Sequence, residues 1–154
     1  MAKDTAKLIE KLNDVLSWEL AGIIQNLNHA ALITGVRRLE FGSMFKANSA
    51  ENHDHAEQLA ERISALGGVP TVEPAKIRQA TTLEAMLEAS LALEEDAMKA
   101  WQAALAASDG APAGIGFWLE DMISEEQQHI DEFRMLTGKV SFSAKEVKEA
   151  TQAG

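Results

Sequence analysis

Four long segments with helical periodicity constrain the fold of this chain more than any other feature. In each segment apolar residues recur every three or four positions, as on one face of an amphipathic helix. The segments span about residues 5–34, 39–66, 81–108 and 112–136. A chain of 154 residues with four such segments is predicted to be one all-α domain. The first segment illustrates the pattern, with an apolar face made of Leu8, Leu12, Val15, Leu16, Ile23, Leu27 and Ala30.

The links between these segments predict the topology. Gly35 ends the first segment, Gly67-Gly68 ends the second, and Gly110 separates the third from the fourth. Glycine favours the left-handed backbone turn that ends many helices. The link over residues 69–80 is much longer than the other two. Two short links and one long one indicate two antiparallel hairpins joined by a crossover, as in many four-helix bundles.

Two capping boxes mark further helix starts. Thr81 with Glu84 is predicted to begin the third helix, and Ser143 with Glu146 a short helix in the tail. The tail helix has little apolar face. We therefore predict a bundle domain over residues 1–138 and a tail with a short helix over residues 139–154.

Composition narrows the classes of function. The formal net charge is −10 at pH 7, whereas binding of nucleic acid needs a basic face. No apolar run follows the opening Met-Ala-Lys-Asp, so we expect no signal peptide, and no apolar stretch is long enough to span a bilayer. It has no cysteine, which excludes disulfides and thiolate metal sites and fits a reducing cytoplasm. We therefore expect a cytoplasmic protein with no nucleic-acid or membrane partner.

Polar residues interrupt all four apolar faces near their middle. A buried carboxylate without a partner costs several kcal/mol, on the order of the stability of a small domain, so such interruptions call for a compensating charge. One such residue alone is more often salt-bridged or on a misjudged face than a ligand. Here they occur on every helix, at Glu19 on the first, Asn52 and His55 on the second, Glu94 on the third, and Glu126 and His129 on the fourth.

The interruptions also follow an internal repeat. Glu19 precedes His55 by about the same distance as Glu94 precedes His129, so each hairpin offers one glutamate and one histidine. The Glu126-x-x-His129 spacing directs both side chains to one metal from one helix. Glutamate oxygens bridge cations and imidazoles terminate them, which suits iron or manganese. The pattern predicts a two-metal site, whereas His29 and His53 are expected to be surface or interface histidines.

The sequence resembles the ferritin-like superfamily, and within it bacterioferritin. The likeness covers nearly the whole chain to about Leu136. It is carried by the motifs Leu12-Asn13-x-x-Leu16-x-x-Glu19-Leu20-x-x-Ile23, His55-Ala56-Glu57, Leu66-x-Gly68-x-Pro70, Leu91-Ala92-Leu93-Glu94 and Glu126-x-x-His129-Ile130-Asp131.

The resemblance implies a di-iron site with one altered ligand. The metal ligands that it implies are Glu19, His55, Glu94, Glu126 and His129. A bridging glutamate is expected three residues before His55, but Asn52 stands there. Glu51 is one residue earlier, and its Cβ points about 100° away from that of Asn52. Glu51 could serve instead of Asn52, or it could be a partner of a ligand or an inner-surface cation site, as could Glu125.

Two further departures concern haem and tyrosine. The bacterioferritin haem is held between two subunits by a methionine where this chain has His53. Histidine can also be an axial ligand, so haem stays open while a solvated His53 is the simpler reading. The tyrosine usual near such di-iron sites is replaced by Asn26.

The function that the resemblance implies is oxidation of Fe(II) by oxygen or peroxide, with storage or detoxification of iron in a cage. Glu19, Glu94 and Glu126 would be the catalytic carboxylates of this ferroxidase, and the cage a homo-oligomer assembled from dimers. The alternative is a ferroxidase-weak or silent bacterioferritin-like subunit with a structural role, in which Asn52 weakens the site. A manganese- or iron-dependent peroxide scavenger is a third reading.

Overall fold

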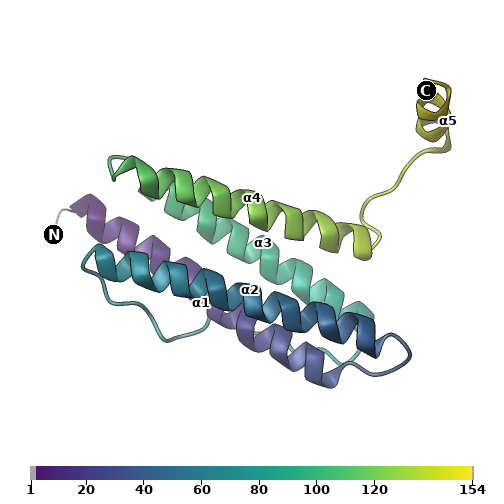
Figure 1. The fold of residues 1–154 in the computed structure, drawn as a ribbon, viewed down its shortest axis with the longest axis horizontal. Helices are drawn as coiled ribbons and strands as arrows, with labels where there is room; N and C mark the ends of the chain where they lie inside the picture. Colours follow the sequence, from purple (N-terminus) through teal and green to yellow (C-terminus); the bar gives the residue numbers. More distant parts are fainter. Residues whose placement is uncertain (1–2, 154) are drawn as a thin grey trace.

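Five α-helices make up the secondary structure of the computed structural model, which describes residues 3–153 and contains no strand in that range. Four long helices form an antiparallel bundle, and a short fifth helix lies beyond it (Figure 1). The predicted all-α four-helix bundle with a short C-terminal helix is confirmed. The helices are α1 (Lys3–Leu32), α2 (Arg38–Ala65), α3 (Leu83–Ala107), α4 (Ala113–Leu136) and α5 (Ala144–Gln152).

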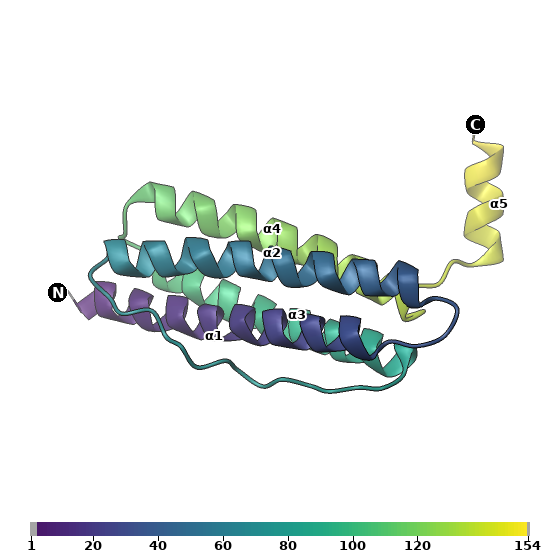
Figure 2. The ribbon, with the colours of Figure 1, turned by 60° about the horizontal axis from the view of Figure 1, so that its bottom comes forward.

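The long crossover between α2 and α3 runs beside α1 (Figure 2). Side chains of α1 hold it there. Asn13 donates from Nδ2 to the carbonyl of Val69 and accepts from the amide of Thr71, at 3.1 and 2.8 Å. Further along, the Arg78 amide donates to Gln25 Oε1 at 2.9 Å. These hydrogen bonds satisfy backbone groups of an extended segment that has no neighbouring strand.

The start of α3 differs by one residue from the prediction. Thr82, and not Thr81, is the N-cap, and its side chain accepts a hydrogen bond from the amide of Ala85 at 3.2 Å. Thr82 has the extended backbone that an N-cap requires, so α3 begins at Leu83. The capping box predicted for Ser143 and Glu146 is present at the start of α5.

Two apolar clusters fill the bundle and leave a polar layer between them. One lies around Leu12, Leu59, Trp101 and Leu119. The other lies toward the opposite end of the bundle and contains Phe41, Phe45, Met86, Leu91, Ile130 and Phe133. The layer between them is built of buried polar side chains, namely Glu19, Asn26, Asn52, His55, Glu94 and Glu126.

The second half of α1 buries a different face from the one predicted. Leu27 is 61% exposed, whereas Gln25 and His29 are buried. The prediction of His29 as a surface histidine is therefore wrong. Its ring packs edge-on against Phe45, with centroids 5.1 Å apart, and burial lowers its pKa. The physical reason is packing between elements, because Gln25 bonds to the crossover and to the Ala89 carbonyl of α3, whereas His29 packs against Phe45 of α2.

Helix α5 projects away from the bundle (Figure 1). None of its Cα atoms comes within 8 Å of a Cα of the other four helices over residues 3–153, and its residues are exposed. The division into a bundle over residues 1–138 and a tail over residues 139–154 stays a prediction. None of the described helices is long and apolar enough to cross a membrane.

Candidate metal centre

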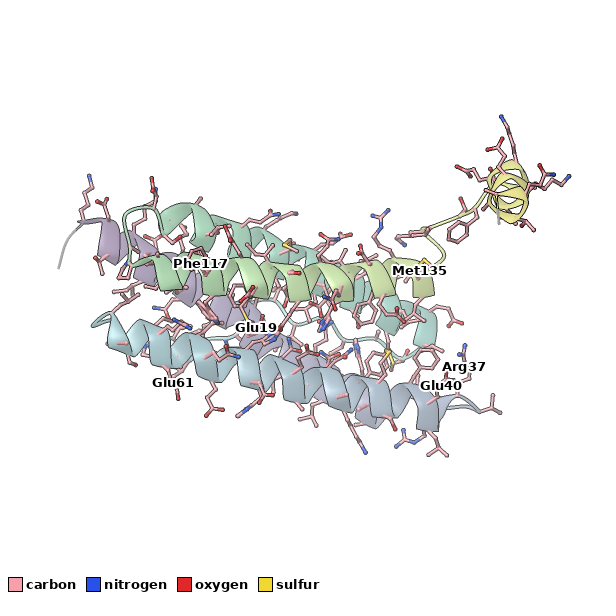
Figure 3. All side chains as sticks on the ribbon, turned by 45° about the horizontal axis from the view of Figure 1, so that its top comes forward. Glu19, Arg37, Glu40, Glu61, Phe117 and Met135 are labelled. Carbon is pink, nitrogen blue, oxygen red and sulfur yellow. The ribbon has the colours of Figure 1, made fainter. Side chains whose placement is uncertain are left out.

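The predicted site residues meet in the polar layer at the middle of the bundle. Glu19 on α1, Glu94 on α3 and Glu126 on α4 are each at most 3% exposed. Figure 3 shows Glu19 directed between the helices, in contrast to Glu61 on the outer surface of α2. His55 on α2 is equally buried. The polar residues that interrupt the apolar faces therefore lie at the same level of the bundle, and side chains from four helices meet there.

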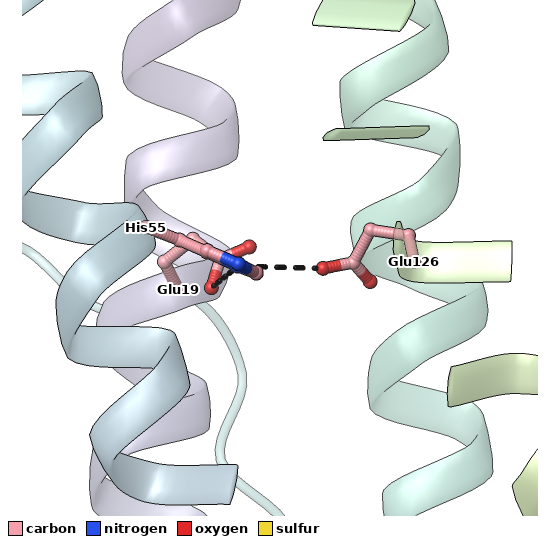
Figure 4. A group of neighbouring side chains, drawn as sticks. All are labelled: Glu19, His55 and Glu126. Atoms are coloured by element: carbon pink, nitrogen blue, oxygen red, sulfur yellow. Dashed lines mark ion pairs between the residues drawn. The ribbon is translucent and has the colours of Figure 1, made fainter. Parts of the chain in front are cut away.

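Glu19, His55 and Glu126 form the tightest group in this layer (Figure 4). His55 Nδ1 lies 3.4 Å from Glu19 Oε2 and 3.8 Å from Glu126 Oε1. One ligand atom from each of the three residues lies within 4.8 Å of the others. Burial alone would lower the pKa of His55, but contact with Glu19 and the charges of Glu51 and Glu125 raise it to about 9. The raised pKa favours the imidazolium form of His55, which places a positive charge beside the carboxylates.

Glu94 and Glu126 are close enough to affect one another's protonation. Burial, together with the charges of Glu94 and Glu19, raises the pKa of Glu126 well above its ordinary value. Burial likewise raises the pKa of Glu94, while the neighbouring Glu126 carboxyl group acts in the opposite direction. Like charges in a buried site oppose each other's ionisation, so the layer favours the protonated form of these two carboxyl groups.

Helices α2 and α4 are bridged by side chains and not by close backbone packing. Over the described residues no Cα of α2 comes within 8 Å of a Cα of α4. Two crossed histidine–glutamate contacts span this seam. His55 Nε2 lies 3.2 Å from Glu125 Oε2, and His129 Nε2 lies 3.1 Å from Glu51 Oε1. Each glutamate therefore orients the histidine of the opposite helix.

Asn52 is buried, and its side-chain amide is part of a chain of hydrogen bonds inside the bundle. Its Nδ2 donates to Glu19 Oε2 at 2.9 Å, and its Oδ1 accepts from Asn26 Nδ2 at 3.0 Å. Glu51 does not take the place of Asn52, because its carboxylate pairs with His129 on the seam. Position 52 thus presents a donor to Glu19 where the repeat predicts a bridging carboxylate.

Residues 9–142 match the family model described as the Ferritin-like domain. This chain belongs to the ferritin-like family. It is 30% identical over 133 residues to the bacterioferritin of Brucella melitensis, covering 84% of this chain and 81% of that protein. It is 27% identical over 126 residues to the bacterioferritin of Mycobacterium tuberculosis, covering 80% of this chain and 79% of that protein.

A solved structure shares the ferritin-like fold closely. It belongs to a ferritin-like, diiron-carboxylate protein of Bacillus anthracis and superposes with a TM-score of 0.85. The identity is 32%, and the match covers 89% of this chain and 99% of that one.

Two polar neighbours of the ferritin-like centre escaped the sequence analysis. Trp101 Nε1 donates to Glu19 Oε1 at 3.2 Å. Asn26 was noted only for the missing tyrosine, yet it holds Asn52. Each stands seven residues after a predicted ligand, Trp101 after Glu94 and Asn26 after Glu19. Positions i and i+7 share a helix face, so this spacing is the signal that could have found them.

The centre has the donor set and the unsatisfied atoms that a cation requires. Among residues 3–153, buried Glu126 Oε2 and His55 Nδ1 have no hydrogen-bond partner. Such atoms cost free energy unless a ligand or an ion satisfies them. Carboxylate oxygens and imidazole nitrogens are ligands for divalent iron and manganese. The residues present therefore fit a cation in the polar layer.

His53 lies apart from this centre. It is exposed, as predicted, and lines an open groove with Leu16, Leu20 and Ile23 of α1. It also neighbours Asp54 and Glu57 on the surface of α2. Haem binding at His53 stays a prediction.

Proposed function

We propose that this chain binds iron at the bundle centre and oxidises Fe(II) there. Glu19, His55 and Glu126 would hold one cation, and Glu94, Glu126 and His129 a second, with Glu126 between them. The observation that carries the proposal is the buried group of Glu19, His55 and Glu126, whose ligand atoms lie within 4.8 Å of one another. Similarity to bacterioferritins and to a diiron-carboxylate protein supports iron as the metal.

The redox step requires an oxidant from solution. Two Fe(II) ions each lose one electron to become Fe(III). One dioxygen takes up these two electrons and two protons to become hydrogen peroxide. With hydrogen peroxide as the oxidant, the same two electrons and two protons cleave the O–O bond and release two water molecules.

The protein positions the ions and handles protons. Trp101 donates to Glu19 and fixes its carboxylate on the wall of the site. The proton that Glu94 and Glu126 hold is displaced when cations bind, because the cations supply the missing positive charge. The apolar clusters on both sides of the layer exclude bulk water from the reaction.

The wider setting of the proposal is an oligomeric cage in the cytoplasm. Similarity to bacterioferritins supports a homo-oligomer of this chain, built from dimers, in which oxidised iron is stored or detoxified. The acidic charge of −10 would favour the approach of cations to such an assembly.

A second candidate function follows from Asn52. Its amide donates to Glu19 and supplies no negative charge, so the first hairpin offers a weaker cation site than the second. On this reading the chain is a ferroxidase-weak or silent subunit that assembles with an active partner chain.

Anaerobic Fe(II) titration followed by exposure to air tests the proposal. About two ions per chain, oxidised much faster than in buffer, are expected of a ferroxidase. At most one ion, with oxidation at the buffer rate, would instead support the silent subunit. Peroxide consumption without mineral formation would indicate a scavenger, and electron microscopy of the purified protein would show whether a cage forms.

A further inference from the structure

We propose that Asn52 becomes a ligand of the bound cation by turning its side-chain amide, and that Asn26 turns with it. The inference rests on the proposed function only in that a divalent cation binds at the bundle centre. It assigns to Asn26 and Asn52 a relay with two hydrogen-bonded states, of which the structure contains the one in which Asn52 donates to Glu19.

Glu19 sets the first of these two states. Its carboxylate accepts from Asn52 Nδ2 at 2.9 Å, so the carbonyl oxygen of Asn52 is turned away toward Asn26. Asn26 Nδ2 donates to that oxygen at 3.0 Å. Among the described residues, Asn26 Oδ1 is buried and has no partner. The pair therefore contains one acceptor without a partner, and the hydrogen bond between the two amides can form with either side chain as the donor.

A second state keeps the bond between the two amides. If both amides turn by half a rotation, Asn52 Nδ2 donates to Asn26 Oδ1, which is the acceptor now without a partner. The hydrogen bond between the two side chains is retained, and Asn52 Oδ1 faces Glu19. Two oxygens facing each other repel, so this state needs a positive charge between them.

Gly22 provides the room for this rotation. A Cβ at position 22 would lie 2.7 Å from both Cγ and Oδ1 of Asn52 and 2.8 Å from its Nδ2. Gly22 lies inside α1, where glycine costs about 1 kcal/mol relative to alanine. The bare backbone leaves the flat amide free to turn against α1.

A cation selects the second state. Amide oxygens are ligands of hard divalent cations, whereas an amide NH₂ group repels them. The turned Asn52 would thus add a neutral oxygen ligand beside Glu19 and partly replace the missing carboxylate. Asn26 does not touch the cation in this scheme and is a positioning residue.

Anaerobic calorimetry with Co(II) tests the relay without any oxidation. Asn52→Leu should weaken Co(II) binding at the Glu19 side at least fivefold, about the affinity equivalent of one hydrogen bond. Asn26→Asp leaves only acceptors at position 26, so it should favour the turned Asn52 and tighten binding about fivefold. In the Asn52→Leu background, Asn26→Asp should tighten Co(II) binding only by the effect of its added negative charge. Asn28→Asp on the same helix is the control that measures this charge effect.

Gly22→Ala provides a second route that leaves both amides in place. It should weaken Co(II) binding because the added methyl group obstructs Asn52. Thermal melts of each metal-free variant confirm folding. Unchanged or tighter binding by Asn52→Leu, unchanged binding by Gly22→Ala, or a gain from Asn26→Asp that persists without Asn52 would each overturn the relay.

The outcomes separate this inference from the proposed function. Co(II) binding without coupling between positions 26 and 52 would overturn the relay and leave iron binding intact. Coupling as expected, with no oxidation of Fe(II), would keep the relay and refute the ferroxidase. No cation binding at all would refute both.

Discussion

At the scale of single residues, the metal centre contains carboxyl groups whose negative charges repel one another. Glu19, Glu94 and Glu126 share a buried layer, and the pKa of Glu126 is raised by burial and by the other two carboxylates. The metal-free protein therefore contains an electrostatic cost that a cation relieves. Substitutions that remove a charge should affect binding and stability in opposite directions.

Glu126→Gln is the first case. The glutamine keeps the size of the side chain and removes a negative charge that burial opposes. We expect Co(II) binding to weaken more than tenfold while the melting temperature of the metal-free protein stays equal or rises. Glu120→Gln, exposed on the same helix, should alter neither quantity. Unchanged Co(II) affinity of Glu126→Gln would remove Glu126 from the ligand set.

Glu125→Gln tests the crossed pairs on the seam. Glu125 contacts His55 at 3.2 Å and should keep its Nδ1 directed inward. Loss of a carboxylate that orients a metal-binding histidine typically lowers affinity about 10- to 100-fold. Calorimetry with Co(II) should show a loss in this range, whereas Glu61→Gln on the outer surface of α2 should show none. Equal affinities for the two variants would contradict an orienting role.

At the scale of elements, helix ends depend on local geometry that periodicity does not resolve. Thr81 and Thr82 are chemically identical candidates for the cap of α3. Only Thr82 directs its hydroxyl oxygen to the amide of Ala85, because the crossover reaches the extended conformation at that residue.

Thr82→Ala should therefore lower the free energy of unfolding by about 1 kcal/mol, the usual value of an N-cap hydrogen bond. Urea unfolding of the metal-free protein measures this change. Thr81→Ala is the matched control and should leave the free energy of unfolding nearly unchanged. A larger loss for Thr81→Ala than for Thr82→Ala would place the cap where the sequence predicted it.

At the scale of the whole molecule, protonation of the buried layer couples stability to pH. The folded state raises the pKa of His55 from 6.5 to about 9, and it raises the pKa of Glu94 and Glu126 as well. All three groups hold protons more tightly when folded than when unfolded. Stability is therefore lost as pH rises.

The contribution of His55 is fully present below pH 6.5 and is lost as pH approaches about 9. Its size is on the order of 3 kcal/mol. Urea unfolding of the metal-free protein at pH 6 and at pH 9.5 should show this decline. His55→Gln should flatten it, whereas His53→Gln, at an exposed position, should not. A free energy of unfolding of the metal-free protein that rises between pH 6 and pH 9.5 would contradict protonation of the buried layer.

The sequence by itself determined the helices, their order and the set of polar residues on their inner faces. Helical periodicity places Glu19 and Glu94 among apolar residues on one face of their helices, and this holds whichever element packs against that face. Residue types and spacing were therefore enough to predict a metal centre in the middle of the bundle.

Tertiary structure alone decided which atoms meet. Gln25 is buried by its bonds to the crossover and α3, and His29 by packing against Phe45 of α2, although neither lies on the apolar face that periodicity predicted. The wide seam between α2 and α4 pairs Glu51 with His129 and keeps it away from the place of Asn52. Contacts between helices depend on the distance and rotation of one helix relative to another, which the periodicity of a single helix does not encode.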